Sequence, residues 1–268
     1  MLAKVNFSNV VLGKLVTERV ALIFEAGWLI VLIVRMIEKS IAKRGLLPTL
    51  VYAARWPLIV YGERQSLLKR NTMQSQFDDR HGTDTAGIIP LSSFSVQNPV
   101  WVHGVRYAPT SQEGFERSLS MLSFDRERYK EFAFVDVGSG KGATLLYASD
   151  LGFKAVYGIE LVKELHDIAA RNISLYPTAR NVGQSICASA TDFRMPEPPL
   201  VVFANYPFSS KELMDDVVRN IAASGEGRKY LVADNFPYDP AALPSARLRL
   251  IGSLQTSAGN HNYAFEVL

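Results

Sequence analysis

The chain has 268 residues and a formal net charge of +3, with 48% hydrophobic and 21% charged residues. This composition is ordinary for a globular protein, and the length suits one domain with an extension. Its single cysteine, Cys187, excludes an internal disulfide, and its four histidines lack the spacing of metal ligands. The composition therefore predicts a folded domain that needs neither a disulfide nor a metal ion.

The amino-terminal part carries an apolar run, Val20 to Val34, between Arg19 and Arg35. This run includes Glu25 and is shorter than the ~20 residues that span a bilayer. A second apolar run, residues 46–61, is interrupted by two prolines and an arginine, which argues against a second span. Residues 1–76 are therefore expected to form a helical extension that precedes a ligand-binding domain over residues 77–268.

Positive charge is concentrated in this extension. Residues 1–62 contain eight basic and three acidic residues, a net +5, so the remaining chain carries 3 − 5 = −2. An apolar and basic segment favours contact with the cytoplasmic face of an anionic membrane. A helix packed on its own domain, or on a second subunit in a homodimer, explains the pattern equally well. No stacking or groove-reading motif indicates a nucleic-acid partner.

The most informative stretch is Phe134 to Glu160, which reads as strand, glycine-rich turn, helix, strand and acid. Gly138, Gly140 and Gly142 let the backbone turn sharply and approach a ligand closely, with Ser139 between the first two. Amides at the helix start would face an anionic group. The carboxylate of Glu160 could accept hydrogen bonds from both hydroxyls of a ribose.

Three cofactor classes compete for this loop. A P-loop is disfavoured because Lys141 is followed by Gly142 rather than Ser or Thr, and a dinucleotide fingerprint is matched only loosely, with Ala143 at its last position. S-adenosylmethionine fits better, because Asp136, two residues before the first glycine, can approach its amino group. This cofactor also has no pyrophosphate to bind.

The rest of the domain continues the alternation of strands and helices. An amphipathic helix is expected at 162–173, and the capping box at 209–212 opens a helix that ends at 224–225. Strands are expected at 183–188, 199–205 and 228–235, followed by an antiparallel hairpin of 246–255 and 262–268. The predicted fold is α/β, a Rossmann-like seven-stranded mixed sheet with helices on both faces.

Asn205 to Phe208 (NYPF) is the predicted chemical centre, because Asn205 ends the fourth strand, where open α/β sheets place reacting ligands. Its amide oxygen could accept a hydrogen bond from an amine or amide nitrogen and aim that nitrogen at a sulfonium methyl. Pro207 fixes the turn, and Tyr206 or Phe208 could pack against a flat or alkyl substrate. The alternative is an ordinary turn in which Asn205 bonds its own backbone.

The motifs VDVGSGKG, GIEL, ATDF and NYPF together resemble class I S-adenosylmethionine-dependent methyltransferases. Phe77 to Gly87 and Tyr107 to Thr110 resemble segments that precede the cofactor domain in a bacterial group related to the non-SET lysine methyltransferases. The resemblance covers about residues 77–268. It implies that Tyr107 and Thr110 contact the cofactor and that the enzyme works in the cytoplasm, where S-adenosylmethionine is made.

One segment departs from the family pattern. Where the family commonly reads G-D-A, with the acid near the adenine amino group, this chain has Ala188, Ser189 and Ala190. Ser189 can still accept a hydrogen bond, and Asp192 either replaces the acid or caps the next turn. The resemblance thus implies a methyltransferase acting on a nitrogen of a protein side chain or small molecule. The alternative is a non-catalytic module that binds S-adenosylmethionine or a nucleotide and is anchored to a partner through its amino-terminal helices.

Overall fold

The computed structural model describes residues 45–94, 96, 98–236, 247–255 and 261–268. The chain divides between Gly62 and Glu63, within the helix α2 (Leu46–His81). Residues 63–76, expected to belong to the extension, therefore lie in the same unit as the predicted domain. No helix among the described residues is long and apolar enough to cross a membrane, and the run Val20 to Val34 lies outside those residues.

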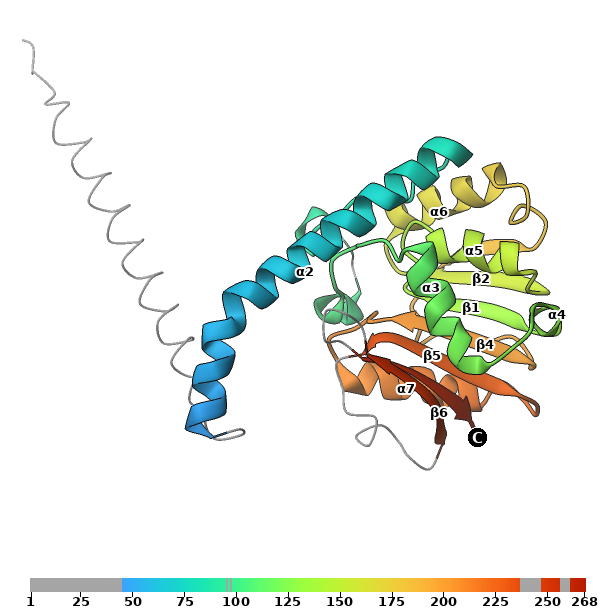
Figure 1. The fold of residues 1–268 in the computed structure, drawn as a ribbon. Coiled ribbons are helices and arrows are strands. Elements are labelled where there is room, and N and C mark those ends of the chain that lie inside the picture. Colours follow the sequence, from blue (N-terminus) through green and yellow to red (C-terminus); the bar gives the residue numbers. More distant parts are fainter. Residues whose placement is uncertain (1–44, 95, 97, 237–246, 256–260) are drawn as a thin grey trace, which may run out of the picture. The chain divides into compact units, whose positions relative to one another are not determined.

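The second unit is built on one seven-stranded sheet in the order β3-β2-β1-β4-β5-β7-β6 (Figure 1). Its strands are β1 (Ala133–Val137), β2 (Ala155–Glu160), β3 (Gly183–Cys187), β4 (Leu200–Asn205), β5 (Lys229–Phe236), β6 (Leu248–Gln255) and β7 (His261–Val267). The first five are parallel, and β7 runs antiparallel to both β5 and β6. The predicted mixed sheet with a carboxyl-terminal hairpin at its edge is confirmed.

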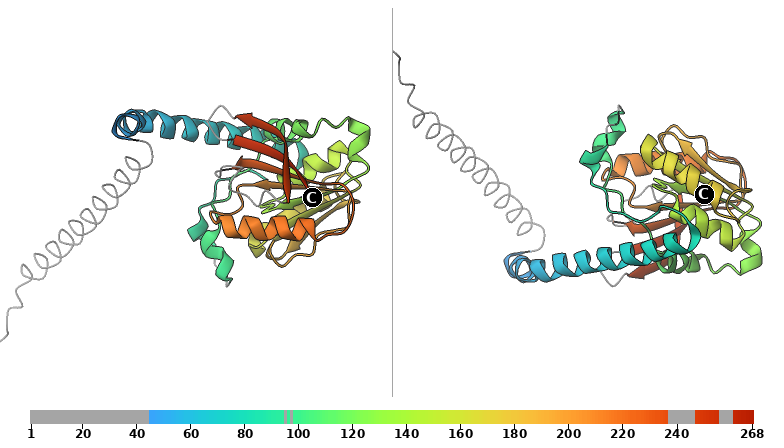
Figure 2. Two further views of the ribbon diagram at one scale, coloured as in Figure 1. Left: turned by 90° about the horizontal axis from the view of Figure 1, so that it is seen from below. Right: turned by 90° about the horizontal axis from the view of Figure 1, so that it is seen from above.

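Helices cover both faces of this sheet. The first face carries α3 (Gln112–Leu119), α5 (Ala143–Leu151) and α6 (Lys163–Leu175), and the opposite face carries α7 (Lys211–Ala222). Figure 2 shows α7, in orange, on the far side of the sheet from residues 63–81 of α2. The remaining short elements are α4 (Arg126–Tyr129), η1 (Leu91–Ser93), η2 (Pro99–His103) and η3 (Ser120–Leu122).

Side chains alternate between the two faces along each central strand. In β4, Val201 and Phe203 belong to the core beneath α5, whereas Val202 and Ala204 belong to the core beneath α7. Burial on both faces explains why this strand reads as a continuous apolar run. Because β1 to β5 run in the same direction, their carboxyl-terminal ends lie along one side of the sheet. The predicted site residues lie along that side.

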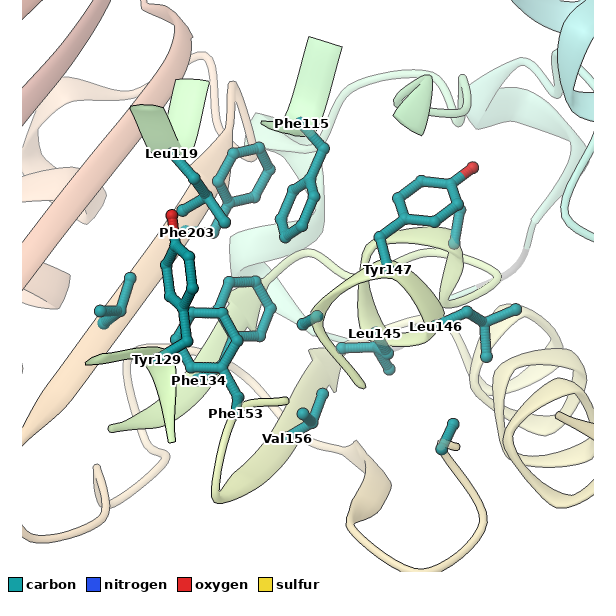
Figure 3. Close-up of a cluster of buried hydrophobic side chains, with 14 of the residues drawn as sticks. Phe115, Leu119, Tyr129, Phe134, Leu145, Leu146, Tyr147, Phe153, Val156 and Phe203 are labelled. Carbon is teal, nitrogen blue, oxygen red and sulfur yellow. The ribbon is translucent and has the colours of Figure 1, made fainter. Parts of the chain in front are cut away.

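Aromatic rings fill the first core. Phe115 of α3 lies 5.6 Å from Phe134, 5.3 Å from Phe203 and 5.8 Å from Tyr147, measured between ring centroids (Figure 3). Edge and tilted contacts of this kind stabilise beyond simple burial, by about 0.5–1.5 kcal/mol per pair. The core thus ties α3, which no sequence pattern predicted, to the strand that precedes the glycine loop.

Two helix boundaries differ from expectation. Ser210 rather than Ser209 is the N-cap of α7, and its hydroxyl oxygen accepts from the amide of Leu213. The helix ends at Ala222 with Ala223 as its C-cap, before the glycine expected to end it. Neither difference moves the NYPF segment away from the end of β4.

Candidate functional site

A cavity lies at the carboxyl edge of the parallel strands. Its empty volume, with its open mouth included, is about 1020 Å³. Twelve of the predicted residues line it: Tyr107, Thr110, Asp136, Gly138, Ser139, Gly140, Glu160, Ser189, Ala190, Asn205, Pro207 and Phe208. Gly142, Tyr206 and Asp192 are not among the residues that line it.

The glycine loop has the backbone that its sequence indicates. Gly138, Gly140 and Gly142 have φ values of 78°, 54° and 84°, a left-handed region that disfavours other residues. A Cβ on Gly140 would come within 2.4 Å of the Tyr107 ring, so the ring and the loop are in direct contact. Gly142 precedes α5 and packs against Ala169 instead of facing the cavity.

Tyr107 is held in place by its backbone and by its hydroxyl. It pairs with Ile89 in an isolated antiparallel bridge, and its hydroxyl donates to the carbonyl oxygen of Thr85 at 2.5 Å. Burial raises the pKa of the Tyr107 phenol well above its ordinary value. The ring therefore forms a fixed, neutral wall beside Gly140.

Glu160 is the buried acid at the end of β2. One carboxylate oxygen accepts from the amide of Gly140 at 2.8 Å, and the other accepts from the amide of Val162 at 2.8 Å. Burial raises the pKa of Glu160, while these backbone hydrogen bonds oppose the rise. Because each carboxylate oxygen has a second lone pair, the group can still accept from a ligand's hydroxyls.

Asp136, the second acid, lines the cavity and is 3% exposed. The hydroxyl of Thr144, in the first turn of α5, donates to its Oδ2. Burial raises the pKa of Asp136 to about 7, and the nearby carboxylates of Glu160 and Asp234 add to the rise. A cation at this position would be stabilised by the ionised carboxylate.

The lysine of the loop does not serve the cavity. The Nζ atom of Lys141 contacts Asp84 Oδ1 at 2.7 Å and donates to the carbonyl oxygen of Ala86 at 2.8 Å. Among the described residues that line the cavity, the charged ones are Asp136, Glu160 and the exposed Arg106. The interior is therefore acidic, which opposes a phosphate and favours a cationic ligand.

The loop that receives Lys141 is fixed by Asp78, near the end of α2. Its Oδ1 accepts from the hydroxyls of Thr83 and Thr85 at 2.7 and 2.6 Å, and its Oδ2 accepts from the amides of Thr85 and Ala86 at 2.8 and 2.7 Å. These bonds explain the cluster of polar residues in Phe77 to Gly87. The sequence drew attention to that segment without revealing Asp78 as its anchor.

Asn205 lies at the end of β4 with both ends of its amide bonded. Its Nδ2 donates to Thr110 Oγ1 at 2.7 Å, and its Oδ1 accepts from Asn235 Nδ2 at 2.8 Å. Tyr206 has a φ of 42°, and this turn brings Pro207 and Phe208 to the cavity. The arrangement differs from a turn in which Asn205 bonds its own backbone.

The segment after β3 places Ser189 and Ala190 at the cavity. Ser189 forms a hydrogen bond with the hydroxyl of Thr191 at 2.8 Å. Asp192 is exposed, and its amide donates to the carbonyl oxygen of Ser189 at 3.1 Å. Of the two polar candidates here, the structure brings the serine to the cavity.

The stretch before Tyr107 supplies lining residues that the sequence analysis did not identify. Phe94, Val100 and Trp101 line the cavity, and the rings of Phe94 and Trp101 meet edge to face at 6.3 Å. The amide of Ser209 donates to the carbonyl oxygen of His103 at 2.8 Å, which ties η2 to the NYPF turn. The apolar sequence PVWV after Asn98 was the available signal.

Comparisons with known proteins gave matches of structure. No family model matches the sequence, and no curated protein matches it. A putative methylase from Haemophilus influenzae is 16% identical at a TM-score of 0.46, over 57% of this chain and 98% of that chain. A putative methyltransferase from Escherichia coli is 17% identical at a TM-score of 0.47, over 68% of this chain and 98% of that chain.

A third similar structure is a magnesium protoporphyrin IX methyltransferase from Synechocystis PCC 6803 with bound S-adenosylmethionine. It is 12% identical at a TM-score of 0.46, over 58% of this chain and 77% of that chain. Likeness at such low identity does not carry function from one protein to another. We therefore argue function from the residues of the site.

Proposed function

We propose that this protein is an S-adenosylmethionine-dependent methyltransferase of class I, and that it methylates a nitrogen of a protein side chain or small molecule. One observation carries the proposal. A single cavity joins the glycine loop and Glu160, at one end, to Asn205 at the end of β4. The first part suits a nucleoside-bearing cofactor, and the second suits a nitrogen that receives the methyl group.

The charge of the cavity supports S-adenosylmethionine over the other two cofactor classes. This cofactor carries a sulfonium and an ammonium group, which the carboxylates of Asp136 and Glu160 would attract. A dinucleotide or a nucleoside triphosphate would bring phosphates toward these acids while Lys141 is bonded to Asp84. The two carboxylates would therefore attract the cationic S-adenosylmethionine and repel the phosphates of the other two cofactor classes.

The chemical role that we assign to the protein is positioning. When bound, the cofactor supplies an electrophilic methyl group and a good leaving group. Oδ1 of Asn205 would accept a hydrogen bond from the acceptor nitrogen and aim its lone pair at the methyl. Phe208 and Trp101 would pack against the acceptor and exclude water. Ideal alignment of this kind is worth on the order of 7 to 11 kcal/mol.

The finer assignments rest on the sequence pattern. The resemblance to the bacterial group related to non-SET lysine methyltransferases makes a lysine side chain one of the candidate acceptors that we propose, and the supply of cofactor favours a cytoplasmic location. A non-catalytic binding module is the second candidate function. The position of Asn205 in the cavity favours the enzyme, because a binding module needs no hydrogen-bond acceptor there.

Calorimetry of the full-length protein tests the cofactor. S-adenosylhomocysteine should bind and NAD should not. Glu160→Ala should weaken binding by about 1.5 to 3 kcal/mol, the worth of hydrogen bonds to a charged group. Because Glu160 also accepts from Gly140 and Val162, Glu160→Gln is the matched variant that keeps one acceptor oxygen in place. Tight binding of NAD to the natural sequence would refute the proposal.

The partner of residues 1–62 needs its own experiment. We propose contact with an anionic membrane surface, or a homodimer, through this apolar and basic segment. Full-length protein should sediment with anionic vesicles, less so at high salt, and remain in the supernatant with neutral ones. A concentration-dependent dimer that ignores both kinds of vesicle would leave the homodimer as the explanation.

A further inference from the structure

Asn205 must present its amide oxygen, and not its amide NH2, to the nitrogen that is methylated. A side-chain amide can rotate by half a turn and exchange these two groups with little change in shape. Its orientation depends on its two hydrogen-bond partners, Thr110 and Asn235. Thr110 does not fix the orientation, because a hydroxyl can either donate or accept.

Asn235 can decide, because its own orientation is set by a carboxylate. Its Nδ2 lies 2.8 Å from Asn205 Oδ1 and 3.4 Å from Asp234 Oδ2. An ionised carboxylate only accepts hydrogen bonds, so the group of Asn235 that faces Asp234 must be the NH2. The same NH2 then donates to Asn205, which must face it with its oxygen.

Asn235, Asp234, Asn262 and Ser118 form a hydrogen-bond network, and its remaining bonds also have only one consistent direction of donation. The backbone amide of Asn235 donates to Asn262 Oδ1 at 3.0 Å, and Asn262 Nδ2 donates to Ser118 Oγ at 2.8 Å. Ser118 then donates to Asp234 Oδ1 at 3.0 Å. Asp234 and Asn262 are 5% exposed and Ser118 is 0% exposed, so water does not replace these bonds readily.

The backbone of Asn235 is also selective. Its φ is 50°, in the left-handed region that Asn and Asp adopt more readily than most residues. An asparagine there combines a permitted backbone with an NH2 group directed at Asn205. Asn235 does not line the cavity, so it acts through Asn205.

On the basis of the proposed function, we infer that Asn235, oriented by Asp234, is a positioning residue that keeps Oδ1 of Asn205 available for the acceptor nitrogen. Asn205 Oδ1 has a second lone pair for that nitrogen while it accepts from Asn235. Removing the donor would free the Asn205 amide to rotate. Replacing the donor with an acceptor would reverse it.

Two ligands test this inference without knowledge of the natural acceptor. S-adenosylhomocysteine has no group at the position of the methyl. Sinefungin has an amine-bearing carbon in place of the sulfonium and its methyl, so its amine occupies the transfer position and can donate to Asn205 Oδ1. The ratio of the two affinities, measured by calorimetry on the full-length protein, reports which group Asn205 presents.

Asn235→Asp keeps the size and the permitted backbone. Measured at a pH high enough to ionise both Asp234 and the new carboxylate, it offers only acceptors, so Asn205 should turn its NH2 toward it and its oxygen toward Thr110. We expect sinefungin to bind at least about tenfold more weakly relative to S-adenosylhomocysteine, whose own affinity should stay within about threefold. Asn235→Gly keeps the backbone and removes the donor, and it should give a smaller loss. Asn181→Asp adds the same charge at an exposed position and should leave the ratio unchanged.

Each outcome is decisive. An unchanged ratio in Asn235→Asp would overturn the inference. Equal weakening of both ligands would also overturn it, because that result means that Asn235 only supports the fold. If the natural sequence binds neither ligand, the proposed function itself fails.

Discussion

The two ends of the cavity are built in different ways. At the β1 and β2 end, backbone amides and glycine conformations form the site within Asp136 to Glu160, a short piece of chain. At the β4 and β5 end, side chains form it, and the hydrogen-bonded pair Thr110 and Asn205 is 95 residues apart in sequence. The first end can be recognised from a local motif. The second depends on contacts that exist only in the folded protein.

The two ends also differ in charge. The β1 and β2 end carries Asp136 and Glu160, which suit a cationic cofactor. The other end presents the amide of Asn205 and the hydroxyl of Thr110, and Asp234 behind them is hydrogen-bonded to Ser118 and does not line the cavity. We expect variants at the first end to change cofactor affinity, and variants at the second to spare it.

The largest effect should follow Gly140→Ala. The left-handed φ of 54° costs a side chain roughly 1–2 kcal/mol, and overlap with the Tyr107 ring adds about 1–3 kcal/mol. Binding of S-adenosylhomocysteine should be lost. Gly82→Ala is the matched control, because Gly82 has a φ of 68° with nothing within 4 Å of a new Cβ. Equal loss of stability in urea for both variants, with binding retained, would contradict the packing argument.

A smaller effect on affinity should follow from the pH. Only the ionised carboxylate of Asp136 attracts the ammonium of the ligand, and burial raises its pKa to about 7. Affinity for S-adenosylhomocysteine should therefore increase between pH 6 and 8, by at most about tenfold per pH unit below the pKa. Calorimetry should show this increase flattened in Asp136→Asn and retained in Asp79→Asn, at an exposed position.

The stability contribution of Asp136 has the opposite sign. Because its pKa is higher in the folded protein than the ordinary 3.8, the folded state binds the proton more tightly. The contribution is thus fully present below about pH 4 and is lost as the pH rises through about 7. The free energy of unfolding of Asp136→Asn should lack this decline. If the free energy of unfolding of Asp136→Asn declined as steeply with pH as that of the natural sequence, the decline would arise from other titratable groups.

Ser118→Ala should change stability with little change in cofactor affinity. It removes the hydroxyl between Asp234 and Asn262 and leaves their polar groups buried without this partner, at a cost of about 1–3 kcal/mol. Urea unfolding measures that cost, and Ser120→Ala, at an exposed position on the same segment, should cost less than about 0.5 kcal/mol. A large loss of S-adenosylhomocysteine binding in Ser118→Ala would mean that the two ends of the cavity do not act independently.

The smallest effect on cofactor affinity should come from Asn205→Ala, within about threefold. Transfer of labelled methyl to the acceptor fraction of a cell extract should nevertheless fall at least about tenfold, because the hydrogen bond to the nitrogen acts on the chemical step. Unchanged transfer in this variant would place the acceptor nitrogen elsewhere.

The sequence by itself determined the fold class and the first end of the cavity. Strand, glycine turn, helix and closing acid follow from local rules, because glycine is the residue that readily adopts the positive φ values of such a turn. The hairpin was also readable, since the turn-rich stretch between its strands is too short for a crossover helix. The position of Asn205 at the end of β4 was also predicted correctly, because the end of an apolar run shows where a buried strand stops.

Only the tertiary structure decided what surrounds these residues. It brought Tyr107 against Gly140, directed Lys141 to Asp84 and away from the cavity, and set Asn235 beside Asn205. Each of these contacts joins side chains from separate elements, and residue spacing along the chain carries no information about such contacts. The direction of a buried polar group depends on which donors and acceptors reach it, and packing of the sheet and helices fixes that set.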